Sequence, residues 1–189
     1  MYHIPNDKRA ASSTNNLEKA LYELLMTREM NEISVTDLCH ASGVGRATFY
    51  RLYDNPTDIL RRGLDNAMET IGREQSELMA TGKPIDLKRN MQLLLAHYEP
   101  IEAAVKCHRT DLIHSAIETH LSETRAFIIQ MCAHVDATER QIHYISHLFV
   151  GMMTSMLTAW IKGGRKETAA QLISQMRMFS ELYYKVTHL

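Results

Sequence analysis

The sequence predicts an all-α protein, and two observations carry this prediction. Apolar residues recur at intervals of three and four along most of the 189 residues, which is the spacing of one face of a helix. Alternation with a period of two is rare, and the chain has only eight glycines and four prolines, so it offers little material for strands and tight turns. We therefore expect amphipathic helices joined by short loops.

Composition places the chain among ordinary globular proteins. It is 45% hydrophobic and 23% charged with a formal net charge of −1, so bulk charge by itself does not indicate nucleic acid. Cys39, Cys107 and Cys132 are scattered without CxxC spacing, which is typical of free thiols in a reducing compartment. The polar first residues lack the apolar core of a signal peptide. We expect a cytoplasmic protein.

The first helix is expected to follow a flexible tail over residues 1–13. Asn15 or Asn16 can cap this helix, which should end near residues 28–31. Lys8 and Arg9 in the tail could touch phosphate, but a solvated tail is the preferred interpretation. The apolar stripe of the helix consists of Leu17, Ala20, Leu21, Leu24 and Leu25.

The next segment predicts a short helix with well-defined ends. Ser34 and Asp37 have the spacing of a capping box, so the helix should begin there and run to about Ser42. Gly43 can adopt the left-handed conformation that ends a helix without steric cost. The buried stripe would be Val35, Leu38 and Cys39.

A second short helix should begin near Gly45 or Arg46, after Val44 fills the gap between the two helices. Ala47, Phe49 and Tyr53 can face inward, while donors crowd the outer side and the N-terminal end. Two short helices with such a turn form a helix-turn-helix. A plain helical hairpin is the alternative, but it does not explain the exposed donors Arg46, Thr48, Tyr50 and Arg51.

The run GVGRATFYRLY, residues 43–53, resembles the signature of TetR-type transcriptional repressors, and the similarity extends from about Asn16 to Leu64. The resemblance implies a helix-turn-helix domain over residues 14–55 that binds a palindromic double-stranded DNA operator as a homodimer. Pro56 departs from the family pattern, because a residue that contacts phosphate often stands there; that contact must be absent or supplied by Thr57. The expected DNA-binding residues are Ser34, Thr36, Gly45, Arg46, Ala47, Thr48, Tyr50 and Arg51.

Residues 56–189 are expected to form a helical domain for effector binding and dimerisation. Asn55, Pro56 and Asp58 predict the start of a long helix that runs to about Ala80, with Gly82 and Pro84 beyond its end. Asp136 and Glu139 suggest another capping box. Gly163 and Gly164 suggest the end of the helix that begins there. The further helices are expected at about 87–97, 100–107, 111–134, 137–162 and 167–187.

The helix at 137–162 is apolar around nearly its whole circumference, so we expect it to be buried on all sides. It is judged too short and too interrupted by polar residues to span a membrane. Together with the last helix it suggests a subunit interface, as TetR-type proteins are typically dimers joined there. The expected interface residues are Ile145, Phe149, Met153, Met156, Trp160, Ile173, Met176, Phe179 and Tyr183.

An apolar cavity with a few polar groups is expected among the central helices. Such a cavity would take a neutral or weakly polar organic effector, because no cluster of charged residues is evident there. A solid core without an effector is the alternative. The expected lining is Met68, Ile71, Met91, Leu94, His97, Tyr98, Ile113, His114, Ile117, Phe127 and Met152.

Catalytic and metal chemistry are not expected. His143 and His147 have the i, i+4 spacing of a zinc pair, but Tyr144 stands where a metalloprotease needs glutamate. No catalytic triad or glycine-rich phosphate loop is evident, and no cofactor is predicted. The sequence therefore predicts a ligand-responsive DNA-binding repressor. Its alternative is a TetR-like co-regulator that acts through a protein partner without reading DNA.

Overall fold

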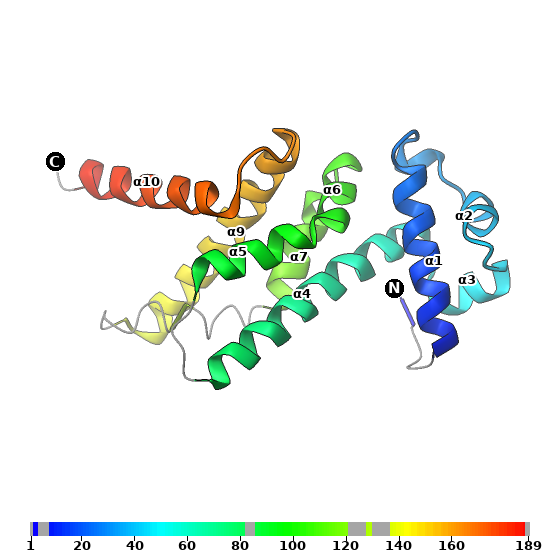
Figure 1. Cartoon of the computed structure of the whole chain (residues 1–189), viewed down its shortest axis with the longest axis horizontal. Helices are drawn as coiled ribbons and strands as arrows, with labels where there is room; N and C mark the ends of the chain where they lie inside the picture. Colours follow the sequence, from blue (N-terminus) through cyan, green and yellow to red (C-terminus); the bar gives the residue numbers. More distant parts are fainter. Residues whose placement is uncertain (1, 4–7, 82–85, 121–127, 130–136, 188–189) are drawn as a thin grey trace. The chain divides into compact units, whose positions relative to one another are not determined.

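The computed structural model describes residues 2–3, 8–81, 86–120, 128–129 and 137–187. Over these residues the regular elements are helices, apart from one isolated bridge between Tyr2 and Tyr53 (Figure 1). The predicted all-α fold is confirmed.

The chain divides into two compact units. The N-terminal unit comprises Met1–Glu69 and Glu99–His120, and the C-terminal unit comprises Thr70–Tyr98 and Leu121–Leu189. The predicted boundary between residues 55 and 56 is not where the units divide. The first half of the long helix packs with the helix-turn-helix, and a segment from residue 99 returns to it, so the N-terminal unit is larger than expected.

In the described part of the chain, the N-terminal unit contains seven helical elements. The residues of α4 from Thr70 onward and Tyr98 of α6 belong to the other unit. The core of the N-terminal unit is formed mainly by Leu17, Leu21, Leu38, Phe49, Leu52, Tyr53, Ile59, Leu60, Leu64, Ile101 and Ile113. The elements are α1 (Lys8–Leu24), a 3-10 helix (Met30–Glu32), α2 (Val35–Ser42), α3 (Arg46–Leu52), α4 (Pro56–Ala80), α6 (Tyr98–Lys106) and α7 (Thr110–Thr119).

The predicted tail over residues 1–13 is wrong for much of its length. Helix α1 begins at Lys8, and Ala10 and Thr14 in its first turns are buried. The Thr14 hydroxyl donates to the Ala11 carbonyl, 2.8 Å away, within the helix. Burial therefore extends α1 through serines and asparagines that have weak helix propensity on their own.

The start of α4 follows the predicted cap. The Asn55 backbone N–H donates to the Asp58 carboxylate, and the Asp58 N–H donates back to the Asn55 side chain, both at 3.2 Å. Pro56 takes the first helical position, where its missing N–H costs nothing. Asp58 is only 1% exposed, and Arg61 lies 3.4 Å from its carboxylate. The cap is thus a buried, charge-paired joint after α3.

The C-terminal unit contains the second part of α4 with α5 (Leu87–Ala96), α9 (Glu139–Lys162) and α10 (Ala169–Thr187), and α5 packs against α10. The N-terminal cap of α9 differs from the prediction. Thr138 and Gln141 form the capping box, whereas the predicted partner Asp136 lies outside the described residues. Gly164, with φ of 83°, supports the predicted stop between α9 and α10.

The helix predicted over residues 111–134 is not continuous. Helix α7 ends at Thr119, and His120 has the non-helical angles φ −95° and ψ 26°. Helical backbone is described again at residues 128–129. The apolar pattern carried on past residue 119 without a glycine or proline, so the sequence contained no signal for this end.

Helix α9 has 24 residues, and its length and hydropathy do not support the expectation that it is too short and too polar to cross a membrane. Within the part of the chain that the structure describes, it is the one helix whose length and hydropathy would suffice to cross a bilayer. Buried core helices of soluble proteins pass the same test. Its buried side chains, among them Val150, Leu157 and Trp160, belong to the packing of the C-terminal unit, whereas Tyr144 and Leu148 are exposed. Within the single chain, α9 is therefore not buried on all sides.

Candidate nucleic-acid interface

The N-terminus of α2 is fixed by its predicted capping box. The Asp37 N–H donates to the Ser34 hydroxyl at 3.1 Å, and the Ser34 N–H donates to the Asp37 carboxylate at 2.9 Å. Arg28 adds an ion pair, with 3.2 Å between its guanidinium and the Asp37 carboxylate. The hydrogen bonds from Ser34, followed by that from Arg28, lower the pKa of Asp37 to about 2. A charged carboxylate at this end also suits the helix dipole.

The turn between α2 and α3 has the expected left-handed residue. Gly43 ends α2 with φ of 69°, a conformation that side chains disfavour. Val44 is buried next to it, and Gly45 is the N-cap of α3. Phe49 and Leu52 then anchor α3, and the Phe49 ring lies 6.0 Å from that of Tyr53. The inner side of α3 is therefore held in the core.

The opposite side of α3 is open to solvent. Arg46, Ala47 and Arg51 are exposed, Tyr50 is 52% exposed, and Thr48 is half-buried. Ala47 was also expected to face inward, which is wrong, because Leu52 occupies the core position beside Phe49 and Tyr53. Ser34, Thr36 and Gly45 are exposed as well.

Arg46 is the central donor of this surface. Its guanidinium lies 3.5 Å from the Thr36 hydroxyl, a long contact that joins the first turn of α3 to the first turn of α2. Both residues lie at helix N-termini, whose free N–H groups favour anions. We call Ser34, Thr36, Arg46, Thr48, Tyr50 and Arg51 the donor surface.

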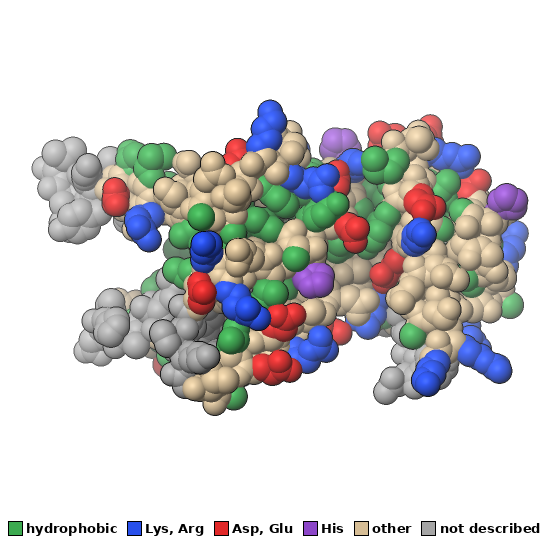
Figure 2. Space-filling view, viewed as in Figure 1, with side chains coloured by type: hydrophobic (Ala, Val, Ile, Leu, Met, Phe, Trp, Pro, Cys, Tyr) green, Lys and Arg blue, Asp and Glu red, His purple; other side chains and the backbone are tan. Residues whose placement is uncertain are grey.

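Basic side chains lie beyond the donor surface as well. Lys8 and Arg9 are exposed in the first turn of α1, and His40 is exposed on α2. Figure 2 shows Lys and Arg side chains at the end of the N-terminal unit where α1 begins and α3 lies. This distribution supplies the positive groups that phosphates require despite the neutral bulk charge.

Solved structures share this fold. The protein Lin0861 from Listeria innocua aligns with a TM-score of 0.71 at 16% identity, covering 96% of each chain. The fatty acid degradation regulator FadR from Bacillus halodurans aligns with a TM-score of 0.62 at 13% identity, covering 86% of this chain and 91% of the other. No family model and no curated protein sequence matches the chain. At such low identity the likeness establishes the fold.

The predicted cavity residues are distributed over both units. Met68, Ile113, His114 and Ile117 belong to the N-terminal unit, and the others that the structure describes belong to the C-terminal unit. His114 is exposed on α7, so it is not a polar group inside a core. Phe127 lies outside the described residues. Met68, Ile71, Met91, Leu94, Ile113 and Ile117 are buried, whereas His97, Tyr98 and Met152 are half-buried.

Tyr98 has defined partners within the C-terminal unit. Its ring centroid lies 6.5 Å from that of Trp160 in an edge-to-face arrangement, and the Arg165 guanidinium lies 3.9 Å from it. The Trp160 indole donates to the Glu167 carbonyl at 3.0 Å. These contacts hold the turn between α9 and α10 against the start of α6.

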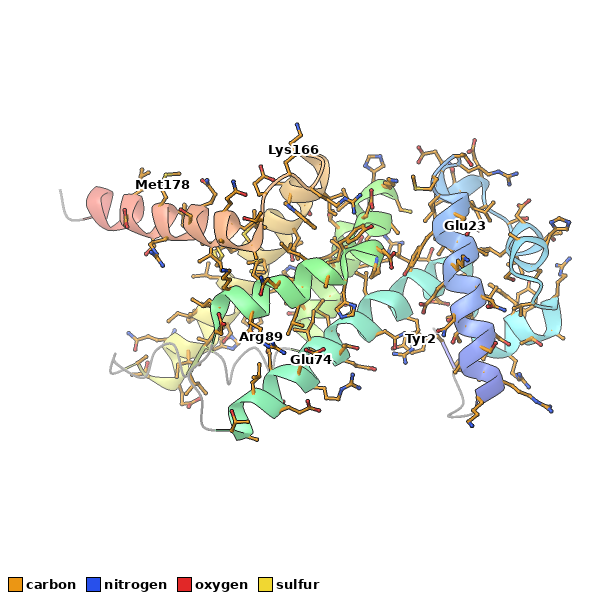
Figure 3. The ribbon with its side chains drawn as sticks, viewed as in Figure 1. Tyr2, Glu23, Glu74, Arg89, Lys166 and Met178 are labelled. Atoms are coloured by element: carbon orange, nitrogen blue, oxygen red, sulfur yellow. The ribbon has the colours of Figure 1, made fainter. Side chains whose placement is uncertain are left out.

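The predicted interface residues fall into two groups. Met153 and Trp160 are buried within their own chain, so they have little surface to offer to a second subunit. Ile145 and Phe179 are exposed, with Tyr144, Leu148, Met178 and Leu182 as exposed neighbours that the prediction missed. Figure 2 shows hydrophobic side chains over α10, from which Met178 projects in Figure 3. Phe149, Met156, Ile173 and Met176 are half-buried, and the Tyr183 side chain lies outside the described part.

The histidine pair on α9 packs ring against ring. The centroids of His143 and His147 lie 4.6 Å apart, and Tyr144 packs edge-to-face on His143. Among the residues that the structure describes, no group of three or more His, Cys, Asp or Glu side chains could hold a metal ion. The 4.6 Å separation shows that the two histidine rings contact each other on α9.

Proposed function

We propose that the chain is a TetR-type transcriptional regulator that binds a palindromic DNA operator as a homodimer, most simply as a repressor. The observation that carries the proposal is the two-sided nature of α3. Its inner residues Phe49 and Leu52 are fully buried, while Arg46 and Tyr50 project into solvent. A helix held in this way after a tight turn is suited to enter the major groove.

The donor surface divides into two roles. Arg46 and Thr48 lie in the first turn of α3, where they can reach base edges, and an arginine recognises guanine through two hydrogen bonds. Thr36, Tyr50 and Arg51 are assigned to phosphates, which fix the register of the protein on the duplex. We assign the phosphate contact near Pro56 to Thr57, which is half-buried at the start of α4.

A co-regulator that acts through a protein partner is the second candidate. In a protein that had lost DNA binding, we would expect neutral or acidic residues in place of the outward hydrogen-bond donors of α3. Arg46, Thr48, Tyr50 and Arg51 are all present, and Tyr50 is the one large apolar side chain of α3 that is exposed. These observations favour DNA over a protein partner.

The deciding experiment captures genomic DNA fragments, including the promoter of the protein's own gene, on the full-length chain. We expect a small set of fragments that share a palindrome, with affinity that falls steeply as salt concentration rises. Enrichment should disappear in the double variant Arg46→Ala, Arg51→Ala. It should survive in Arg140→Ala, Arg177→Ala, which removes two exposed arginines of the C-terminal unit. Uniform recovery of all fragments would contradict sequence-specific binding.

The C-terminal unit is proposed to dimerise and to sense an effector. The exposed apolar residues of α9 and α10 support a second subunit as their partner. The methionine- and leucine-rich packing around Met91 and Leu94 supports a neutral, largely apolar effector. The structural relative FadR is described as a regulator of fatty acid degradation, which agrees with this chemical class. An effector can release DNA only if it binds the high-affinity and the low-affinity conformation of the protein with different strength. Release of the captured DNA fragments by a screened compound would test for such an effector.

A further inference from the structure

A buried polar cluster lies within the N-terminal unit, away from the donor surface. Glu18 and Tyr22 stand one turn apart on α1, and Tyr53 follows α3. The Glu18 Oε1 atom and both tyrosine hydroxyls are buried, and no hydrogen bond to any of the three is found in the part of the chain that the structure describes. Buried polar atoms nearly always have partners, so three together require an explanation.

The cluster lies beside helices α1, α3, α4 and α6. The Tyr22 hydroxyl is so close to Gly63 of α4 that a Cβ atom at residue 63 would collide with it, and Pro100 of α6 is 3.3 Å from the same position. Tyr53 packs against Phe49 of α3, and α1 also packs on α2 and α3. The cluster therefore lies behind the helix that carries the donor surface.

Among the described residues, Arg62 is the cation that acts on the Glu18 carboxylate. Arg62 of α4 lowers the pKa of Glu18, but its guanidinium is also 3.3 Å from Glu69 and 5.5 Å from the centre of the Tyr2 ring. Because Arg62 is shared with these groups, burial dominates and raises the pKa of Glu18 to about 7.

The other charged and titratable groups oppose ionisation of the two tyrosines. Burial and Glu18 raise the pKa of Tyr22, and Glu99 of α6 adds to the effect. Burial and Glu18 also raise the pKa of Tyr53, with Tyr2 and Asp58 acting in the same direction and Arg62 against it. Both hydroxyls thus stay protonated, and Glu18 is the group of the cluster that changes charge near neutral pH.

We propose that Glu18 is a proton-operated latch that holds α1 against the recognition helix and α4. In the neutral state its carboxyl group occupies the buried site without a charge. When the proton leaves to solvent, a charge remains in this site with Arg62 as a shared counter-ion, and the packing of α1 loosens. An influence of the latch on DNA affinity rests on the proposed function; the latch itself does not.

The direction of the pH dependence follows from linkage. The pKa of Glu18 is higher in the folded chain than its ordinary value of 4.5, so between pH 4.5 and 7 the folded state binds the proton more tightly. Stability from the latch is present in full below pH 4.5 and is lost as pH rises through 7. From pH 6 to pH 8 the opening constant of α1 should rise about tenfold by this relation.

The first test needs no substitution. The full-length chain is labelled with ¹³C at glutamate carboxyl groups, and Glu18 is assigned through backbone connectivity. We expect its signal to titrate with a midpoint near pH 7, whereas a midpoint near 4.5 would overturn the proposal. The second test measures hydrogen exchange of α1 amides at pH 6 and pH 8, corrected for intrinsic exchange.

Matched variants separate the latch from general effects of pH. Glu18→Gln should abolish the rise in exchange between pH 6 and pH 8. Glu23→Gln should keep it, because Glu23 is exposed and lies on the same helix (Figure 3). A midpoint near 7 with unchanged exchange in all three chains would also refute the latch. If no DNA fragment binds at any pH, the proposed function fails while these measurements still decide the latch.

Discussion

The hydroxyl of Tyr2 donates a hydrogen bond to the carboxylate of Asp65, with 2.7 Å between Oη and Oδ2, across 63 positions of the sequence. The neighbouring His3 N–H donates to the Leu52 carbonyl at 2.8 Å, and Figure 3 shows Tyr2 beside α4. The beginning of the chain thus connects the end of α3 to α4, where the sequence had suggested a free tail.

Tyr2→Phe should weaken this connection. We expect the free energy of opening at the α3 to α4 junction to fall by about 1 kcal/mol, the usual net value of one hydrogen bond, measured by hydrogen exchange at neutral pH. Tyr50→Phe is the control, since Tyr50 lies on the exposed side of α3. Burial and the Asp65 bond raise the pKa of Tyr2 to about 12, so Tyr2→Phe should remove one of the late-ionising tyrosines from an ultraviolet titration and leave Tyr22 and Tyr53. Equal effects of the two variants on exchange would argue against a structural role of Tyr2.

Gly43→Ala should destabilise the helix-turn-helix. Residue 43 has φ of 69°, and an alanine there costs about 1 to 2 kcal/mol through crowding of its Cβ atom with the backbone. Gly45→Ala is a matched control two residues away, because φ is −67° and a Cβ atom added there would meet no other atom within 4 Å. The measurement is urea denaturation without DNA. If the two alanines proved equally destabilising, the strained turn would not be the cause.

Arg46→Ala should weaken binding to the captured operator by about 1 to 3 kcal/mol and relax base preference, as expected for loss of a good arginine contact to a base. Folding should be unaffected, because the side chain is exposed. Fluorescence anisotropy against the operator and a scrambled duplex gives both quantities. Arg140→Ala serves as the control in the C-terminal unit. An unmutated chain that binds operator and scrambled DNA equally well would sink this prediction.

Phe179→Glu should dissociate the proposed dimer. Phe179 is 66% exposed next to Met178 and Leu182 on α10, so a carboxylate would be buried without a partner on association. Light scattering at micromolar concentration should then report a dimer for the parent chain and a monomer for the variant. Met26→Glu replaces an equally exposed apolar residue of the N-terminal unit and should leave the mass unchanged. A monomeric parent chain would contradict the prediction.

Local signals in the sequence predicted the helix-turn-helix accurately. Ser34 with Asp37, Gly43, and Asn55 with Asp58 each act through the backbone of their own turn, so the sequence is enough to place them. The same holds for Gly164 after α9. These signals also located the candidate DNA-binding residues, because the donors follow once the turn fixes which side of α3 is buried.

Features that depend on distant partners could not be predicted. The early start of α1 depends on burial of Ala10 and Thr14, and the position of Tyr2 depends on Asp65. The sequence around Glu18 carries no local signal that its Oε1 atom is buried. The boundary between the two units likewise lies within α4, at a point where the sequence of the helix carries no signal for it.

The contact between Tyr22 and Gly63 constrains how this chain could diverge. Because a single added carbon at residue 63 would meet the phenol oxygen, the two positions should change together rather than one by one. Homologous sequences with alanine or serine at position 63 are expected to carry a shorter residue at position 22. In a library that randomises both positions, surviving clones should show this anticorrelation in side-chain volume, and a redesign that enlarges either residue must shrink the other.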